Sequence, residues 1–272
     1  MLAALALGTA GAAQSPAAAY YRACMDTARI TQLGSRPLGP MLQQIASLRN
    51  PHQLAGALGR LHSAGIYAAF ELVGEAVPPR PYVQSYAFRE HVTRLFEQLG
   101  YPPAAAASQA IAAIGMETAL PPRRAAPQHL SLAQLQKLAP AFDWVTYFAA
   151  LGEPAAGGLN VADPARLRTL NGNVLVTPLA DWKSYLRWRW LDATALLLSP
   201  PFVQEQLSFY ARVLGSTAPA APPPRAQLCA AARKAYPTDA FLQVPLAPND
   251  YFGSTLALRS WVAHRALQKP LP

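Results

Sequence analysis

The stretch DWKSYLRWRWLDATALLLSPPFVQEQLSFYARVLG, residues 181–215, decides the fold class. At helical period, one side of its first half collects the residues Trp182, Tyr185, Leu186, Arg189, Ala193, Leu196 and Leu197. Lys183 and Arg187 lie on another side, where we expect them to face water. Pro200 and Pro201 interrupt the run, because proline inside a helix loses a hydrogen bond and clashes with the preceding turn. A second helix restarts there and ends at Gly215, so the stretch predicts a helical hairpin or a kinked pair of helices, with several large rings to bury.

The remaining chain predicts an all-α protein, a bundle-like arrangement of helices with proline-rich connectors and little or no sheet. Its 272 residues are 52% hydrophobic and include 27 prolines, enough apolar content for a large core. Helical periodicity extends over residues 20–30, 41–48, 51–62, 86–99, 104–120, 130–138, 142–151 and 251–267. Residues 66–73 fit a strand or a helix, and their length favours a strand. Gly157 to Val161 forms a turn into a short extended piece.

Four segments are expected along the chain. Residues 1–19 are an Ala-rich leader, either a signal-like segment with small residues suited to cleavage or simply the first helix. The run is too short to span a bilayer, so no transmembrane span is expected. Residues 20–215 form the main helical domain, 216–224 an Ala/Pro linker, and 225–272 a C-terminal helical remnant.

The charge pattern argues against a nucleic-acid-binding protein. The formal net charge is +9, and if the basic residues were clustered in one run they would indicate a polyanion-binding surface. The basic residues are instead scattered, and no run of five or more occurs. No nucleic-acid partner is expected, and polyanion binding through the basic surface remains the least favoured of three hypotheses.

No residue qualifies as a catalytic or metal-binding candidate. The five histidines, at 52, 62, 91, 129 and 264, never stand three or four apart, and no H-E-x-x-H occurs. No G-x-S-x-G, G-x-G-x-x-G or P-loop is present either. The two cysteines, Cys24 and Cys229, have no zinc-finger spacing and permit either one disulfide or two free thiols.

Taken together, five segments resemble the N-terminal region of the neprilysin-like zinc metallopeptidases, the M13 family. The first is YYRACMDTARITQLGSRPLGPMLQQI at 20–45, similar to a Cys-Met-Asp helix followed by a Gly-x-x-Pro-Leu turn. METAL at 116–120 resembles a Glu-Thr-x-Leu helix, and PAFDW with YF, within 140–148, resembles an aromatic Pro-x-Phe-Asp-Trp stretch. WKSYLRW at 182–188 and the segment 209–215 resemble the helical pair that follows. Two places are shorter than the family pattern: Pro78–Tyr82, and the stretch after Cys229.

This resemblance implies a cap domain that encloses a peptide-sized cavity over a separate catalytic domain. The zinc ligands and general base of such enzymes lie in that C-terminal part, and the cap-side substrate arginines precede the segments found here. We therefore expect no catalytic, cofactor-binding or metal residue in this chain, zinc belonging to the missing catalytic domain. The resemblance also pairs Cys24 with Cys229 in a disulfide, which implies an extracytoplasmic, periplasmic or secreted setting.

The first hypothesis is thus a truncated N-terminal domain of an M13 metalloendopeptidase, inactive in peptide cleavage on its own. Its expected partners are a separate catalytic domain or a peptide. The alternative is a non-catalytic module that binds a peptide or a protein on the surface that would otherwise face the cavity.

Overall fold

The computed structural model describes residues 15–72, 81–120, 126–153, 157–213 and 223–267. The first helices are α1 (Pro16–Met25), α2 (Thr27–Leu33), η1 (Arg36–Leu38), α3 (Gly39–Ser47), η2 (Pro51–Gln53), α4 (Leu54–Ser63), η3 (Pro81–Gln84), α5 (Tyr86–Gln98) and α6 (Pro103–Ala119). The middle of the chain forms β1 (Gln128–Ser131), α7 (Leu132–Leu138), α8 (Trp144–Leu151), β2 (Gly158–Val161), α9 (Ala165–Val176), α10 (Leu179–Thr194) and η4 (Ala195–Leu197). The last helices are α11 (Pro200–Val213), α12 (Arg225–Lys234), α13 (Thr238–Gln243) and α14 (Tyr251–Leu267).

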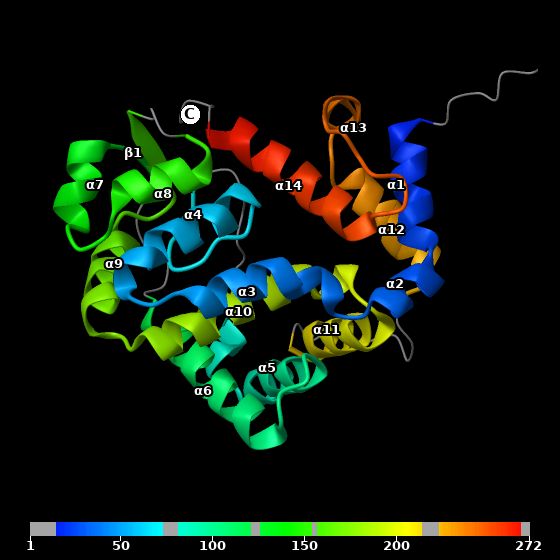
Figure 1. The fold of residues 1–272 in the computed structure, drawn as a ribbon, viewed down its shortest axis with the longest axis horizontal. Helices are drawn as coiled ribbons and strands as arrows, with labels where there is room; N and C mark the ends of the chain where they lie inside the picture. The colour runs from blue at the N-terminus through cyan, green and yellow to red at the C-terminus, as the bar shows by residue number, and fades with distance from the viewer. Residues whose placement is uncertain (1–14, 73–80, 121–125, 154–156, 214–222, 268–272) are drawn as a thin grey trace, which may run out of the picture.

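Figure 1 shows how these helices are distributed around α3 and α10, which cross the middle of the molecule. One end, on the right of the view, is built by α1, α2, α12 and α13, while α14 runs from there across the molecule towards α8. The opposite end holds α7, α8, α9 and the small sheet, while α5 and α6 form the lower corner. The prediction of a mainly helical fold with little sheet is confirmed: in the described residues, β1 and β2 pair antiparallel, with Gln128 opposite Val161.

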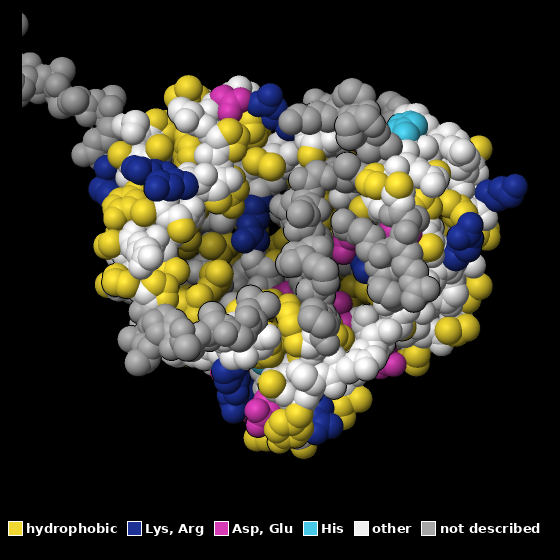
Figure 2. Space-filling view, turned by 180° about the vertical axis from the view of Figure 1, so that it is seen from behind, with side chains coloured by type: hydrophobic (Ala, Val, Ile, Leu, Met, Phe, Trp, Pro, Cys, Tyr) yellow, Lys and Arg dark blue, Asp and Glu magenta, His cyan; other side chains and the backbone are white. Residues whose placement is uncertain are grey.

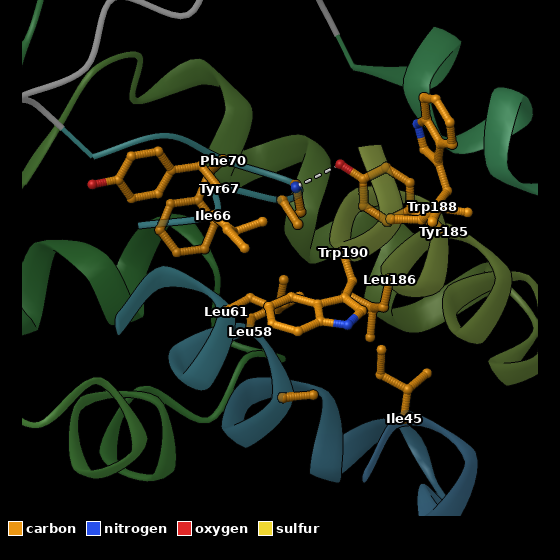
Figure 3. Packing of buried hydrophobic residues seen from close by; sticks show 14 of the residues in the cluster. Ile45, Leu58, Leu61, Ile66, Tyr67, Phe70, Tyr185, Leu186, Trp188 and Trp190 are labelled. Carbon is orange, nitrogen blue, oxygen red and sulfur yellow. Dashed lines mark hydrogen bonds between the residues drawn. The ribbon is translucent and has the colours of Figure 1, made fainter. Parts of the chain in front are cut away.

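The helix α10 is the centre of the core because it is buried on nearly every side. Ten of its residues are buried, and three of its neighbours, α6, α3 and η4, pack directly on it. Figure 3 shows its side chains Leu186 and Trp190 facing α3 and α4, and Tyr185 reaching the segment after α4, while Trp188 points away from these elements, towards Phe88 of α5 and Glu117 of α6. A helix surrounded in this way places its polar side chains inside the protein, where each needs a partner.

A glycine allows α4 and α8 to pack in close contact. A methyl group at Gly59 would lie 2.6 Å from the carbonyl oxygen of Tyr147 and 2.8 Å from the Ala150 side chain. Such distances are below any real carbon contact, so only glycine permits this crossing. The tight crossing brings the end of α4 against the aromatic residues of α8.

The pair of helices predicted over 181–215, with a break near Pro200, is confirmed, with three corrections. The first helix ends at Thr194, and α11 restarts at Pro200, where proline occupies the first turn. Lys183 and Arg187 do not simply face water: they are half-buried and donate to the Ala46 carbonyl and the Gln109 side chain. Leu196, placed on the buried side, is 41% exposed because the chain there is a 3₁₀ turn. Gly215 lies outside the described residues.

Other predicted elements differ at their boundaries. The single helix expected over 20–30 is two helices, since Asp26 leaves helical geometry and its carboxylate accepts from the backbone of Arg29. Asn50 precedes η2, but its side chain makes no capping hydrogen bond. The helix expected over 130–138 begins at Leu132, with Ser131 and Gln134 in a capping box, and Leu130 belongs to β1. The final helix, 251–267, has the predicted bounds.

The strand favoured for residues 66–73 is wrong as an element. Residues 66–71 are irregular, and only Leu72 forms an isolated antiparallel bridge, to Val161. Val73 lies outside the described residues. The physical reason is that long-range side-chain contacts fix this segment, as described below.

A disulfide joins Cys24 of α1 to Cys229 of α12, 205 residues apart in sequence. Both cysteines are fully buried, and the guanidinium of Arg225 donates from Nε to the Cys24 carbonyl at 2.8 Å. The segment 225–267 therefore packs against the start of the chain, and α1 already includes part of the Ala-rich leader at Pro16. Within the described residues, no helix has the length and hydropathy needed to cross a bilayer.

Removal of this disulfide should lower the free energy of unfolding substantially. A bridge across so long a loop restricts the unfolded chain and contributes up to about 5 kcal/mol on the chain-entropy model. The double variant Cys24→Ala/Cys229→Ala should unfold at markedly lower urea than the parent. The reduced parent should match the double variant, and an unchanged urea midpoint in both would contradict the prediction.

Candidate functional site: the buried cluster beneath residues 66–72

The chain segment 66–72 is held by a cluster of buried polar side chains from four helices. It follows α4, which ends at Ser63, and the turn at Gly65, which is in the left-handed region (φ 69°). Figure 3 shows Ile66, Tyr67 and Phe70 of this segment above Leu58 and Leu61 of α4. The segment is irregular and buried, so its backbone groups need partners other than a regular helix or sheet.

Arg189 is the central cation of the cluster. Its side chain, on α10, donates from Nε and Nη2 to the carbonyl of Tyr67 at 3.0 and 2.8 Å. Its Nη1 lies 3.3 Å from Glu117 of α6 and 3.4 Å from Asp192, one turn further along α10. The side chain of Arg189 is only 10% exposed, so the charge is compensated almost entirely by protein groups.

The two carboxylates have further donors of their own. The indole of Trp188 donates to Glu117 at 3.1 Å. The carboxylate of Asp192 accepts from Gln206 at 3.0 Å and from the hydroxyl of Tyr210 at 3.2 Å, both on α11. The cluster thus links α6, α10, α11 and the segment after α4 through charge-assisted hydrogen bonds.

His62, at the end of α4, holds the next residue of the segment. Its Nε2 lies 3.2 Å from the Ala68 N and 3.1 Å from the Ala68 carbonyl oxygen, and its Nδ1 lies 2.8 Å from the hydroxyl of Tyr147. The ring is fully buried and has the rings of Tyr67, Phe70 and Tyr147 around it. Burial lowers the pKa of His62 to about 3, an effect that the nearby Arg189 charge adds to, while the Ala68 carbonyl opposes it.

Ala69 has a strained backbone conformation. Its φ is 64°, a region that alanine rarely adopts, and the N–H of Phe70 donates back to the Ala68 carbonyl at 2.7 Å in a one-residue turn. The Ala69 N–H donates to the hydroxyl of Tyr185 at 2.8 Å, the dashed line in Figure 3. Tyr185, His62 and Arg189 together fix three successive residues and so impose the turn.

Beyond the turn, the segment joins the edge of the small sheet. The carbonyl of Glu71 accepts from the backbone of Ala162 at 3.0 Å, and Leu72 bridges to Val161. The Glu71 carboxylate lies 3.0 Å from the guanidinium of Arg166 on α9. The segment therefore connects the α10 core with the α7–α9 end of the molecule.

Among the described residues of this cluster, no nucleophile lies beside a general base. The cluster can therefore hold the backbone in position but has no pair of groups for nucleophilic catalysis. His62 is sealed from solvent and neutral, so it has neither access nor the pKa for proton transfer near neutral pH. The other histidines lie apart: His91 contacts Glu205, His129 contacts Asn160, and His264 contacts the Leu151 carbonyl. Within the described residues, no group of three His, Cys, Asp or Glu side chains could hold a metal ion, so they do not fit a zinc site.

Sequence reasoning found part of this site. The structure brings together the two candidate residues, Cys24 and Cys229, as the family resemblance implied. The role of His62 was missed, because five isolated histidines look alike in sequence. The sequence did indicate a buried role for Arg189, because this residue occurs on the apolar side of its helix. Burial of an unpaired charge there would cost too much free energy.

Glycine at position 69 should be tolerated much better than glycine at position 68. Both alanines are 2% exposed, so each change removes a similar methyl group. Glycine adopts positive φ without strain. At other positions it lowers stability by about 1 kcal/mol, because it loses more backbone entropy on folding. Ala69→Gly should therefore be about 1 kcal/mol more stable in urea unfolding than Ala68→Gly. Equal losses in the two variants would show that the turn at Ala69 stores no strain.

The buried imidazole should make the protein less stable as pH falls from 6.5 towards 3. Between these values the unfolded His62 binds a proton and the folded one does not. Stability then rises with pH by up to about 1.4 kcal/mol per unit, and this contribution is lost on acidification. Urea unfolding from pH 7 to pH 5 measures the slope.

The variant His62→Gln, which cannot titrate, should show a shallower slope. Should that variant fail to fold, the imidazole C–H signals of the parent give a second measurement. The His62 signal is expected to stay constant from pH 7 to pH 5, and a shift typical of protonation would contradict the assignment.

Comparisons with known proteins support the fold just described. The sequence model for the N-terminal part of peptidase family M13 matches residues 2–81 and 79–244. No curated protein gives a significant match to the chain. Among solved structures, the zinc metalloprotease Zmp1 of Mycobacterium tuberculosis in its open state matches with a TM-score of 0.80 and 20% identity, over 96% of this chain and 57% of that one.

Two further structures agree at lower similarity. Zmp1 in complex with an inhibitor has a TM-score of 0.75 at 20% identity, over 93% of this chain and 54% of that one. PepO from Lactobacillus rhamnosis HN001 has a TM-score of 0.59 at 16% identity, over 83% of this chain and 42% of that one. The chain spans about half the length of these proteins, and at such identity they show a common fold. Because the sequence model covers more than half of its residues, the chain belongs to peptidase family M13.

Proposed function

We propose that this chain is the helical, non-catalytic half of an M13 peptidase and cleaves no peptide on its own. The observation that carries the proposal is the state of its histidines. Two of them, His62 and His91, are sealed in the core, and the described residues offer no set of donors for zinc. Catalytic zinc needs three protein ligands around an open position, and a general base within reach of the bound water. Zinc and its ligands would then come from a catalytic domain outside this chain.

The shape of the molecule is consistent with a domain that walls off a cavity. Figure 2 shows a face that is hollowed near its centre, with side chains of Lys or Arg and of Asp or Glu visible around the hollow. A hollow with both signs of charge suits the backbone and termini of a short peptide. The buried cluster beneath residues 66–72 would keep this wall rigid while a partner domain closes against it.

The buried disulfide supports an extracytoplasmic setting for the protein. Disulfides persist in oxidising compartments and are rare where thiols are kept reduced. The bridge between Cys24 and Cys229 links α1 covalently to α12, which would protect a secreted or periplasmic domain from unfolding.

The same hollow face favours a second function, that of a peptide-binding module without catalysis. A peptide held there would contact charged groups of both signs, and its binding would not require zinc. Binding of unlabelled short peptides, measured by calorimetry with the purified chain, separates this function from that of a purely structural wall.

Zinc content and peptidase activity of the purified chain test the first proposal. After dialysis, elemental analysis should find far less than one zinc per molecule, and fluorogenic peptides should remain intact. A family member that includes its catalytic domain serves as the positive control under the same conditions. Stoichiometric zinc together with chelator-sensitive cleavage by homogeneous protein would overturn the proposal.

A further inference from the structure

The two stretches of chain poorest in acidic residues meet at one end of the molecule. Residues 15–70 contain a single carboxylate, Asp26, and residues 206–238 contain none. The first stretch forms α1, α2 and η1, and the second contributes α12, which packs on α1. The disulfide between Cys24 and Cys229 fixes this contact.

Five exposed cations occupy these helices, and we define them as the basic end: Arg22, Arg29, Arg36, Arg233 and Lys234. A sixth, Arg225, is half-buried behind them and donates to the Cys24 carbonyl. Among the ion pairs of the described residues, none includes any of the six. Two carboxylates lie at this end: Asp26 accepts from the backbone N–H of Arg29, and Asp239 of α13, which packs on α1, pairs with Arg265 of α14.

The opposite end of the molecule has the reverse balance. Over residues 128–181 the cations are Lys137, Arg166 and Arg168, and the carboxylates are Asp143, Glu153, Asp163 and Asp181. The five cations of the basic end, with Arg225 and Asp26, contribute +5 of the formal net charge of +9, whereas residues 128–181 contribute −1. Figure 2 agrees with this, since dark blue side chains gather on the side where α1 and α12 lie.

We propose that the basic end docks on an anionic lipid surface. Its five cations lie on four neighbouring elements, α1, α2, η1 and α12, and their charge is complementary to the phosphate groups of an anionic membrane. Apolar and aromatic groups accompany the charges: Met25 is 38% exposed, and the guanidinium of Arg233 lies 5.8 Å from the ring centre of Tyr21. Such a mixture of cations with interfacial side chains is typical of peripheral membrane contacts.

Binding to vesicles tests the proposal with the full chain. Sedimentation with phosphatidylcholine vesicles containing phosphatidylglycerol should bind the protein, and vesicles of phosphatidylcholine alone should not. The neutral vesicles also control for the apolar residues 2–13, which carry no charge. Binding should weaken at high salt, because exposed charges are screened.

A matched pair of variants locates the surface. Each exposed cation near an anionic membrane contributes about fivefold in affinity. Arg22→Gln/Arg29→Gln/Arg233→Gln should therefore weaken binding by about a hundredfold. Arg49→Gln/Lys137→Gln/Arg168→Gln removes the same charge elsewhere and should change binding only a few-fold.

Three outcomes would overturn the proposal. The first is equal binding to anionic and neutral vesicles, and the second is an equal loss in the two triple variants. The third is salt-dependent retention on heparin without binding to anionic vesicles, which would assign the basic end to an extended polyanion. None of these outcomes depends on zinc or on peptidase activity, so the proposed function can fail or hold separately.

Discussion

The structure depends on how the charge of Arg189 is satisfied inside the core. A guanidinium that is almost fully removed from water is tolerable only with acceptors on all its N–H groups. Here those acceptors are the Tyr67 carbonyl and two carboxylates, and each carboxylate brings its own donors from other helices. Loss of Arg189 would leave two buried carboxylates without a cation, and loss of either carboxylate would leave the other as the one charged partner of Arg189 in the cluster. The positions of α6, α10, α11 and the segment after α4 are therefore mutually constrained in a way that apolar packing alone does not require.

Aromatic packing stabilises the same region. Phe70, on the constrained segment, contacts the rings of His62, Phe142, Trp144 and Tyr147 with centroid distances between 4.7 and 6.2 Å. Most of these contacts are edge-to-face, the geometry that ring quadrupoles favour. The polar cluster fixes the backbone of residues 66–72, and the rings fill the space beside it. Together they explain how an irregular segment can be buried without a regular hydrogen-bonding pattern.

The limits of sequence reasoning follow from the range of the interactions. Amphipathic helices such as α5 and α14 could be predicted because their burial pattern is local. The helix α9 was not predicted, since Asn171, Gly172 and Asn173 are weak helix formers, yet Leu167, Leu170 and Val174 bury it against neighbouring elements. The conformation of residues 66–72 could not be predicted at all, because Tyr185 and Arg189 contact it across more than 100 residues. The cysteine pairing came only from the family resemblance, since two cysteines alone do not specify a bridge.

Under the proposed function, these constraints bear on what the non-catalytic half of such a peptidase needs in order to work. A wall of a reaction cavity contributes by its shape, and a shape that shifted with each closing motion would not hold a peptide in register. The buried charges supply that rigidity, because a charge cluster has few alternative arrangements of similar energy, whereas an apolar core has many. The surrounding side chains also determine the strained turn at Ala69, and the protein tolerates the strain energy of that backbone conformation. A buried, non-catalytic cluster in a peptidase family is then understandable as the device that keeps the non-catalytic half in one conformation.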